Sequence, residues 1–189
     1  MIQELKELSE ILDTLKRQGH IENYGLIGGM ALSVWGTPRT TMDIDMLVLV
    51  QAQLKDNLVA ELKKHNIDGE LKTGDPMEPI PSMIDAEYKG IEIDIICVSK
   101  KWELESMKNT ITVDIDNKAI PVVDPYYFAI LKLKAGGPQD ILDVQNMLTY
   151  NDKIDHVKLR EIANTFKVSH KLEQIMTKLQ QPEVSRRRR

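Results

Sequence analysis

Residues 28–50 constrain the fold more than any other stretch of this sequence. The stretch opens with a glycine pair, passes through a short apolar segment and reaches Asp43-Ile44-Asp45, which leads into an apolar run. Alternate side chains of a strand point to the same face, so Asp43 and Asp45 stand together on one side of a sheet. Adjacent carboxylates repel each other and lose hydration, and a hard divalent cation with oxygen ligands relieves both costs. The pattern predicts a metal site that handles phosphate.

The order of these signals resembles the nucleotidyltransferase superfamily that shares its catalytic fold with DNA polymerase β. The residues that carry the match are Gly28, Gly29, Arg39, Thr41, Asp43 and Asp45. Within the superfamily, the chain looks most like small stand-alone proteins related to the AbiEii toxins of abortive-infection and toxin–antitoxin systems. The resemblance implies that Asp43 and Asp45 bind metal and take part in catalysis. It also implies that the glycine pair, Arg39 and Thr41 lie at the nucleotide.

The family pattern requires a third carboxylate on a neighbouring strand. Residues 91–98 read as an apolar strand with Glu92 and Asp94 on one face. We prefer Asp94 as the third catalytic and metal-binding residue, because it lies between two isoleucines, where a buried charge most needs a metal. Glu92 is the alternative ligand, or a group that supports the ligands.

The glycine pair and Arg39 also have readings from physical chemistry. Glycines at a helix N-terminus let a triphosphate approach free backbone amides, where the helix dipole favours negative charge. A glycine pair alone is typical of a plain turn, and only its spacing to the later aspartates indicates a phosphate site. Arg39 could pair with Asp43 and Asp45 or bind a phosphate through two hydrogen bonds.

A second family signature lies in residues 130–144. Lys132 matches a lysine that in relatives approaches nucleotide phosphates or the catalytic carboxylates, and Asp140 and Asp143 match a pair of aspartates. We expect Lys132 and Asp140 at the nucleotide; the alternatives are a solvated lysine and an ordinary charge in the first turn of a helix. Relatives often carry arginine where this chain has Gly137, which removes one expected contact with the substrate.

The sequence predicts an α+β fold, with a mixed-sheet nucleotidyltransferase core and a helical C-terminal part. We place the catalytic core at 1–123, a helical region packed on it at 124–181, and a disordered basic tail at 182–189. Residues 72–82 contain three prolines and a glycine, which predicts a loop that could face the substrate as a lid.

Composition limits the partners and the compartment. The net charge is −4 although Arg186–Arg189 add four positive charges, so the rest of the chain is strongly acidic and argues against a large nucleic-acid groove. No apolar run approaches the ~20 residues that span a membrane, so we expect no membrane partner. The single cysteine suits a reducing compartment, and we expect a cytoplasmic protein.

We therefore expect a Mg²⁺-dependent nucleotidyltransferase that moves a nucleoside monophosphate from an NTP to an acceptor hydroxyl and releases pyrophosphate. Two Mg²⁺ ions are expected, with Mn²⁺ as an alternative. The acceptor could be tRNA, a protein or a small molecule, and the resemblance to toxins implies a cognate antitoxin. Two other functions remain open: a catalytically inactive binding or regulatory protein with this fold, and a phosphohydrolase that uses the same carboxylates on water.

Overall fold

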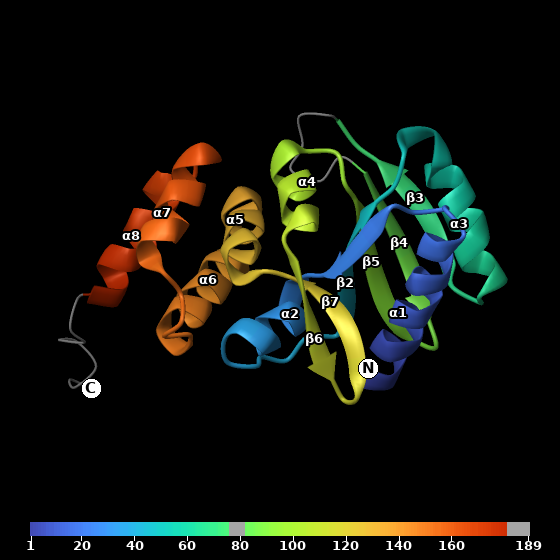
Figure 1. The fold of residues 1–189 in the computed structure, drawn as a ribbon, viewed down its shortest axis with the longest axis horizontal. Helices are drawn as coiled ribbons and strands as arrows, with labels where there is room; N and C mark the ends of the chain where they lie inside the picture. The colour runs from blue at the N-terminus through green and yellow to red at the C-terminus, as the bar shows by residue number, and fades with distance from the viewer. Residues whose placement is uncertain (76–81, 181–189) are drawn as a thin grey trace.

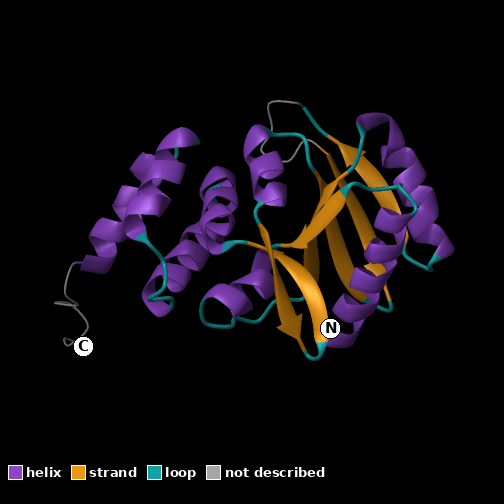
Figure 2. Cartoon of the chain, in the orientation of Figure 1, coloured by secondary structure: helices purple, strands orange, loops and turns teal. Residues whose placement is uncertain are grey.

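The computed structural model describes residues 1–75 and 82–180, and it contains a mixed seven-stranded sheet with helices on both sides (Figures 1 and 2). The strand order is β3-β4-β5-β2-β1-β7-β6. The strands are β1 (Asn23–Leu26), β2 (Asp43–Leu49), β3 (Asp68–Thr73), β4 (Ser82–Tyr88), β5 (Ile91–Cys97), β6 (Thr110–Ile115) and β7 (Lys118–Val123). Neighbours β2 and β5 are parallel, as are β1 and β7, and the other pairs are antiparallel. The predicted α+β class with a mixed sheet is confirmed.

The helices divide between the two faces of this sheet. They are α1 (Ile2–Arg17), α2 (Gly28–Trp35), α3 (Lys55–Lys64), α4 (Lys101–Lys108), α5 (Pro125–Ala135), α6 (Pro138–Tyr150), α7 (His156–Thr165) and α8 (Ser169–Gln180), with a short 3-10 turn at Ala52–Leu54. Figure 1 shows α1 and α3 on one side of the sheet and α4 to α8 on the other. The division into domains at residue 123 stays a prediction.

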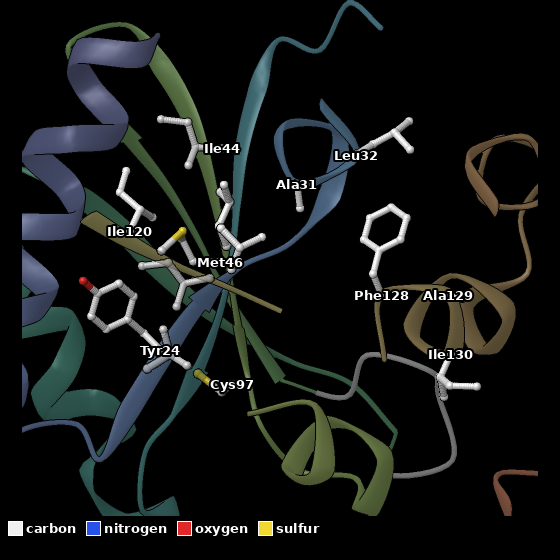
Figure 3. Packing of buried hydrophobic residues seen from close by; sticks show 14 of the residues in the cluster. Tyr24, Ala31, Leu32, Ile44, Met46, Cys97, Ile120, Phe128, Ala129 and Ile130 are labelled. Atoms are coloured by element: carbon white, nitrogen blue, oxygen red, sulfur yellow. The ribbon is translucent and has the colours of Figure 1, made fainter. Parts of the chain in front are cut away.

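The core forms because α1 and the central strands present apolar faces to each other. Leucines at three- and four-residue spacing along α1, including Leu5 and Leu12, are fully buried. On the sheet, Ile44 and Met46 are also fully buried, and Figure 3 shows Tyr24, Ile44 and Ile120 on the side of the sheet that faces α1. The aspartates that alternate with Ile44 and Met46 are therefore directed to the opposite face.

The C-terminal helices begin and end at residues that suit those positions. Asp124 caps α5 by accepting a hydrogen bond from the backbone nitrogen of Tyr127 at 2.8 Å, and Pro125 occupies the first turn. Gly136 ends α5 in the left-handed conformation at φ 71°, and α6 begins directly afterwards at Pro138. This tight break brings the C-terminal end of α5 beside the N-terminal end of α6.

One expectation was wrong in part. The predicted loop at 72–82 includes Lys72 and Thr73, which belong to β3, and Ser82, which begins β4. Strand β3 is an edge strand whose side chains are mostly exposed and polar, so its sequence lacks the apolar alternation that marks a half-buried strand. The prolines of the predicted lid and the predicted tail at 182–189 lie outside the described residues.

Within 1–75 and 82–180, no helix combines the length and the apolar character that crossing a membrane requires.

The burial of Leu12 between α1 and the sheet can be tested by comparing its truncation with that of an exposed leucine on α6. Leu12→Ala should lower the free energy of unfolding by about 2–5 kcal/mol, because it leaves a cavity in a fully buried position. The control Leu142→Ala, at a side chain that is 54% exposed on α6, should change it by less than about 0.5 kcal/mol. Equal effects in urea denaturation would contradict this account of the core.

Candidate active site

The predicted carboxylates meet on the face of the sheet opposite α1 and α3. Strands β2 and β5 pair in parallel, with Asp45 opposite Asp94 and Asp43 opposite Glu92. Asp43, Asp45 and Asp94 each offer one carboxylate oxygen, and these three oxygens all lie within 4.8 Å of one another. Each of the three residues is partly exposed, so a ligand can reach the cluster, whereas Glu92 is more exposed and lies outside it. The structure thus assembles the preferred trio, whose role in the reaction stays a prediction.

The charges of the trio are poorly compensated by the protein itself. Burial raises the pKa of Asp45 to about 6, with further contributions from Asp43 and Asp94 that outweigh Lys132 and the Gly29 amide. Burial also raises the pKa of Asp94, helped by the neighbouring Asp85 and Asp43 carboxylates. The raised pKa values of Asp45 and Asp94 show that these two carboxylates resist ionisation, and a hard divalent cation stabilises such clustered oxygen donors in their charged form.

The glycine pair is required by the position of Asp45. Gly28 has φ +66°, and a Cβ built there would lie 1.7 Å from Oδ2 of Asp45. A Cβ on Gly29 would lie 2.7 Å from Oγ1 of Thr41, and the Gly29 amide hydrogen-bonds to Asp45. Helix α2 begins at Gly28, so the glycine pair forms its first turn. The N-terminus of α2 therefore lies directly against the carboxylate trio.

Thr41 and Arg39 lie in the segment between α2 and β2, and each hydrogen-bonds to a carboxylate outside it. The Thr41 hydroxyl donates a hydrogen bond to Oδ1 of Asp43 and so orients this carboxylate. Arg39 donates from Nε to Oδ1 of Asp143 at 2.8 Å and from Nη2 to Oδ2 at 3.1 Å. The expected pairing of Arg39 with Asp43 and Asp45 is therefore wrong. Arg39 instead forms a bidentate pair with Asp143 of α6.

Lys132 is held in a buried ion-pair cluster and is not a solvated lysine. Its side chain is 15% exposed, and Nζ lies 3.0 Å from Oδ1 of Asp140 and 3.0 Å from Oδ2 of Asp143. Burial alone would lower the pKa of Lys132, but the hydrogen bonds to Asp140 and Asp143 raise it, so the lysine stays charged. Asp140 also accepts a hydrogen bond from the Gly137 amide at 3.0 Å and so caps α6.

Asp143 is the residue that joins these cations. Its side chain is 1% exposed, and it binds Arg39, Lys132 and Gln139. Burial raises the pKa of Asp143, but these hydrogen bonds outweigh it and hold the pKa below its ordinary value. The sequence pattern matches Asp143 to the family aspartates but does not place it at the nucleotide, although the spacing Asp-x-x-Asp puts both carboxylates on one side of α6.

Two hollows meet at this site. A polar cleft is lined by Arg39, Thr40, Thr41, Met42, Asp43, Asp45, Lys132, Gln139 and Asp140. A second cavity is lined by Ile27, Gly28, Asp45, Leu47, Ile96, Trp102, Glu103, Phe128, Leu131, Lys132, Lys134, Ala135 and Asp140. Asp45, Lys132 and Asp140 line both hollows, so the two adjoin. Asp94 lines neither and faces the open part of the sheet.

The acidic surface extends far beyond the trio, and the sequence did not predict this extent because the exposed, polar strand β3 lacks an apolar alternation. Residues that pair directly across strands have side chains on the same face, and two such rows are entirely acidic. The first row is Asp68, Glu87, Glu92 and Asp43, and the second is Glu70, Asp85, Asp94 and Asp45. Lys72 pairs with Asp85 within this surface, and Lys63 lies 3.8 Å from Asp68 at its edge. The face beside Asp94 therefore has a strongly negative potential.

Comparison with known proteins agrees with this geometry. The sequence model of the family described as "Nucleotidyl transferase AbiEii toxin, Type IV TA system" matches residues 10–188. No curated protein matches the chain.

Solved structures share the fold at low sequence identity. The antibiotic-resistance factor ANT(2″)-Ia has 12% identity and a TM-score of 0.58, over 95% of this chain and 100% of that one. A crystal structure of ANT(2″)-Ia in complex with adenylyl-2″-tobramycin has 13% identity and a TM-score of 0.54, over 89% and 99%. An antigenic nucleotidyltransferase-like protein from Paracoccidioides brasiliensis has 18% identity and a TM-score of 0.50, over 93% of both chains.

The contact between Gly28 and Asp45 can be separated from backbone strain by a matched pair of variants. Gly90→Ala, at φ +79° with nothing within 4 Å of the new Cβ, should cost only the left-handed conformation, about 1–2 kcal/mol. Gly28→Ala should cost about 1–3 kcal/mol more, because the new methyl group displaces Asp45. Chemical denaturation measures both, and equal costs would show that Asp45 does not pack against Gly28.

The raised pKa of Asp45 predicts a pH-dependent effect of Asp45→Asn without metal. In the native protein the pKa is about 6 against 3.8 in the unfolded chain, so the stability of the protonated form is lost as the pH rises through about 6. The asparagine variant should therefore be more stable than the wild type at pH 7.5, by about 3 kcal/mol at most, and gain less at pH 4.5. Thermal unfolding in EDTA tests this, and an equal gain at both pH values would contradict it.

Proposed function

The chain belongs to the AbiEii family of nucleotidyltransferase toxins of type IV toxin–antitoxin systems, and we propose that it transfers a nucleoside monophosphate from an NTP to an acceptor hydroxyl with the help of a divalent cation. The observation that carries the proposal is the carboxylate trio within 4.8 Å, placed beside the helix N-terminus at Gly28 and the cations of the polar cleft. In the reaction, the acceptor oxygen bonds to the α-phosphorus, and the bond to the bridging oxygen breaks. Pyrophosphate leaves with the electron pair of the broken bond, and the proton of the acceptor hydroxyl passes to solvent water.

The residues present fit Mg²⁺, with Mn²⁺ as the alternative. Asp43, Asp45 and Asp94 would hold the metal, since they offer compact, charged oxygen ligands and leave room for water and phosphate oxygens. When bound, two such ions would neutralise the phosphates and make the acceptor hydroxyl more acidic.

The chain's own groups would bind the triphosphate in the polar cleft. Beside this cleft, the start of α2 carries the positive end of the helix dipole, which already holds Asp45 through the Gly29 amide and favours a phosphate close by. Lys132 lines the cleft and can exchange part of its pairing with Asp140 for a phosphate oxygen. Asp143 acts indirectly, because it holds Arg39 and Lys132 against the cleft from a buried position.

The acceptor class follows from the potential around Asp94. The acidic rows on β3, β4 and β5 would repel a phosphate backbone laid across them. Among RNA, protein and small molecules, this favours an acceptor that presents a neutral or cationic surface at Asp94. An RNA acceptor would have to reach the trio with its end alone.

The inactive alternative has less support. A protein that only kept the fold would have no need to hold three mutually repelling carboxylates beside a buried lysine. Gly137 stands where the family resemblance implies an arginine, but it lines neither hollow, and Lys132 and Arg39 remain in the polar cleft. Metal-dependent binding of NTP distinguishes a nucleotide enzyme from a protein that has lost this site.

The central prediction is that Asp45→Ala abolishes transfer without unfolding the protein. Each of the four α-labelled NTPs would be incubated with cell lysate and Mg²⁺, and the products separated on denaturing gels and thin-layer plates. The wild type should label one acceptor class. Asp45→Ala should label none, because it would remove a proposed metal ligand that lies where the two hollows adjoin.

The second Asp-x-Asp of the chain provides the matched control. Asp114 accepts a hydrogen bond from the Asn117 amide at 3.0 Å in the hairpin between β6 and β7, so Asp114→Ala should retain transfer. Undiminished labelling by Asp45→Ala would overturn the mechanism. Release of phosphate from NTP without a labelled acceptor would favour the phosphohydrolase instead.

A further inference from the structure

The second cavity has a character that the phosphate-binding cleft lacks. Its volume is about 240 Å³, and it lies between the sheet and helices α4 and α5. Its walls are mostly apolar, with Leu47 and Ile96 from the sheet, Trp102 from α4, and Phe128 and Leu131 from α5. The cavity also has charged lining residues, namely Asp45, Glu103, Lys132, Lys134 and Asp140. A mostly apolar wall with a limited number of polar groups is typical of pockets that hold small organic ligands.

The two hollows together match the two ends of a nucleoside triphosphate. Such a molecule carries a polyanionic chain at one end and a flat aromatic base at the other. The polar cleft adjoins the apolar cavity at Asp45, Lys132 and Asp140, where the phosphates would meet the metal ligands and the buried cation. A single ligand can therefore extend from one hollow into the other.

Trp102 is the aromatic side chain best suited to contact a base in this cavity. It is partly exposed, whereas Phe128 is 1% exposed and serves the core. The Lys134 ammonium lies 4.3 Å from the centroid of the Trp102 ring, and this cation–π contact orients the indole. Stacking on an indole does not depend on hydrogen bonds and is open to any base.

We propose that the apolar cavity is the nucleobase subsite and that Trp102 stacks on the base. The inference rests on the proposed function, because it places the other end of the same NTP. The acceptor is the competing occupant. In-line displacement requires the acceptor to enter opposite the departing pyrophosphate, and Asp94, which lines neither hollow, opens onto the exposed acidic face. That face is the path left for the acceptor once the NTP fills both hollows.

Tryptophan fluorescence tests whether a base stacks on Trp102, because the chain has only one other tryptophan, Trp35. Trp35 lines neither hollow and donates from Nε1 to the Val123 carbonyl at 2.8 Å, so Trp35→Phe leaves Trp102 as the only indole reporter. In this variant, NTP with Mg²⁺ should quench the emission. Inorganic tripolyphosphate with Mg²⁺ should bind without quenching, because it fills only the polar cleft.

Affinity gives a second measurement. Trp102→Ala should weaken NTP binding roughly 5- to 150-fold, the equivalent of losing one base–aromatic stack, and leave the Kd of tripolyphosphate unchanged. The matched control Trp35→Phe should bind both ligands as wild type does. The fluorescence experiment keeps the inference testable if Trp102→Ala does not fold.

The outcomes separate the two proposals. Metal-dependent binding of NTP and tripolyphosphate with equal affinity and no change in Trp102 emission would overturn the base subsite and leave the proposed function standing. An effect of Trp102→Ala on the KM of the acceptor alone would assign the cavity to the acceptor. Absence of metal-dependent binding of both ligands would overturn the proposed function and this inference together.

Discussion

The mutual repulsion of three carboxylates is the constraint on which the rest of this site depends. Asp43, Asp45 and Asp94 are brought together by two parallel strands whose other face is buried, so none can turn away without exposing the core. The surroundings reduce the repulsion only in part, through the Gly29 amide and the charge of Lys132. Without a cation this arrangement lowers the stability of the fold, and with a bound cation the repulsion is relieved. Such an arrangement is characteristic of a functional site.

A single buried carboxylate connects this sheet to the C-terminal helices. Asp143 on α6 binds Arg39, which precedes β2, and Lys132 on α5. Removing one member of such a cluster leaves a buried charge without its partner, so the positions of α5, α6 and the segment before β2 depend on one another. The polar cleft exists because this cluster holds its walls in place, and its cations are already paired with protein carboxylates when a phosphate arrives.

The accuracy of the sequence-based predictions follows the range of the interactions involved. The hairpin at Asp114–Lys118 depends on local contacts, because Asp114 accepts a hydrogen bond from the Asn117 backbone amide and Asp116 and Asn117 adopt positive φ values. The cap at Asp124 and the end of α5 at Gly136 also depend on residues close together in the chain. Strand β3 was missed because an exposed edge strand needs no apolar alternation, and the two acidic rows were missed with it.

By itself, the sequence determined the alternation that puts Asp43 and Asp45 on one face and the α+β class. These depend on the geometry of a strand or a turn and on residues close together in the chain. Only the tertiary structure decided that Arg39 binds Asp143, that acidic rows extend across four strands, and that Trp102 lines a cavity beside Lys132. Those contacts join segments that are far apart in the sequence. Strand register and helix packing determine them, and the spacing of residues along the chain does not encode either.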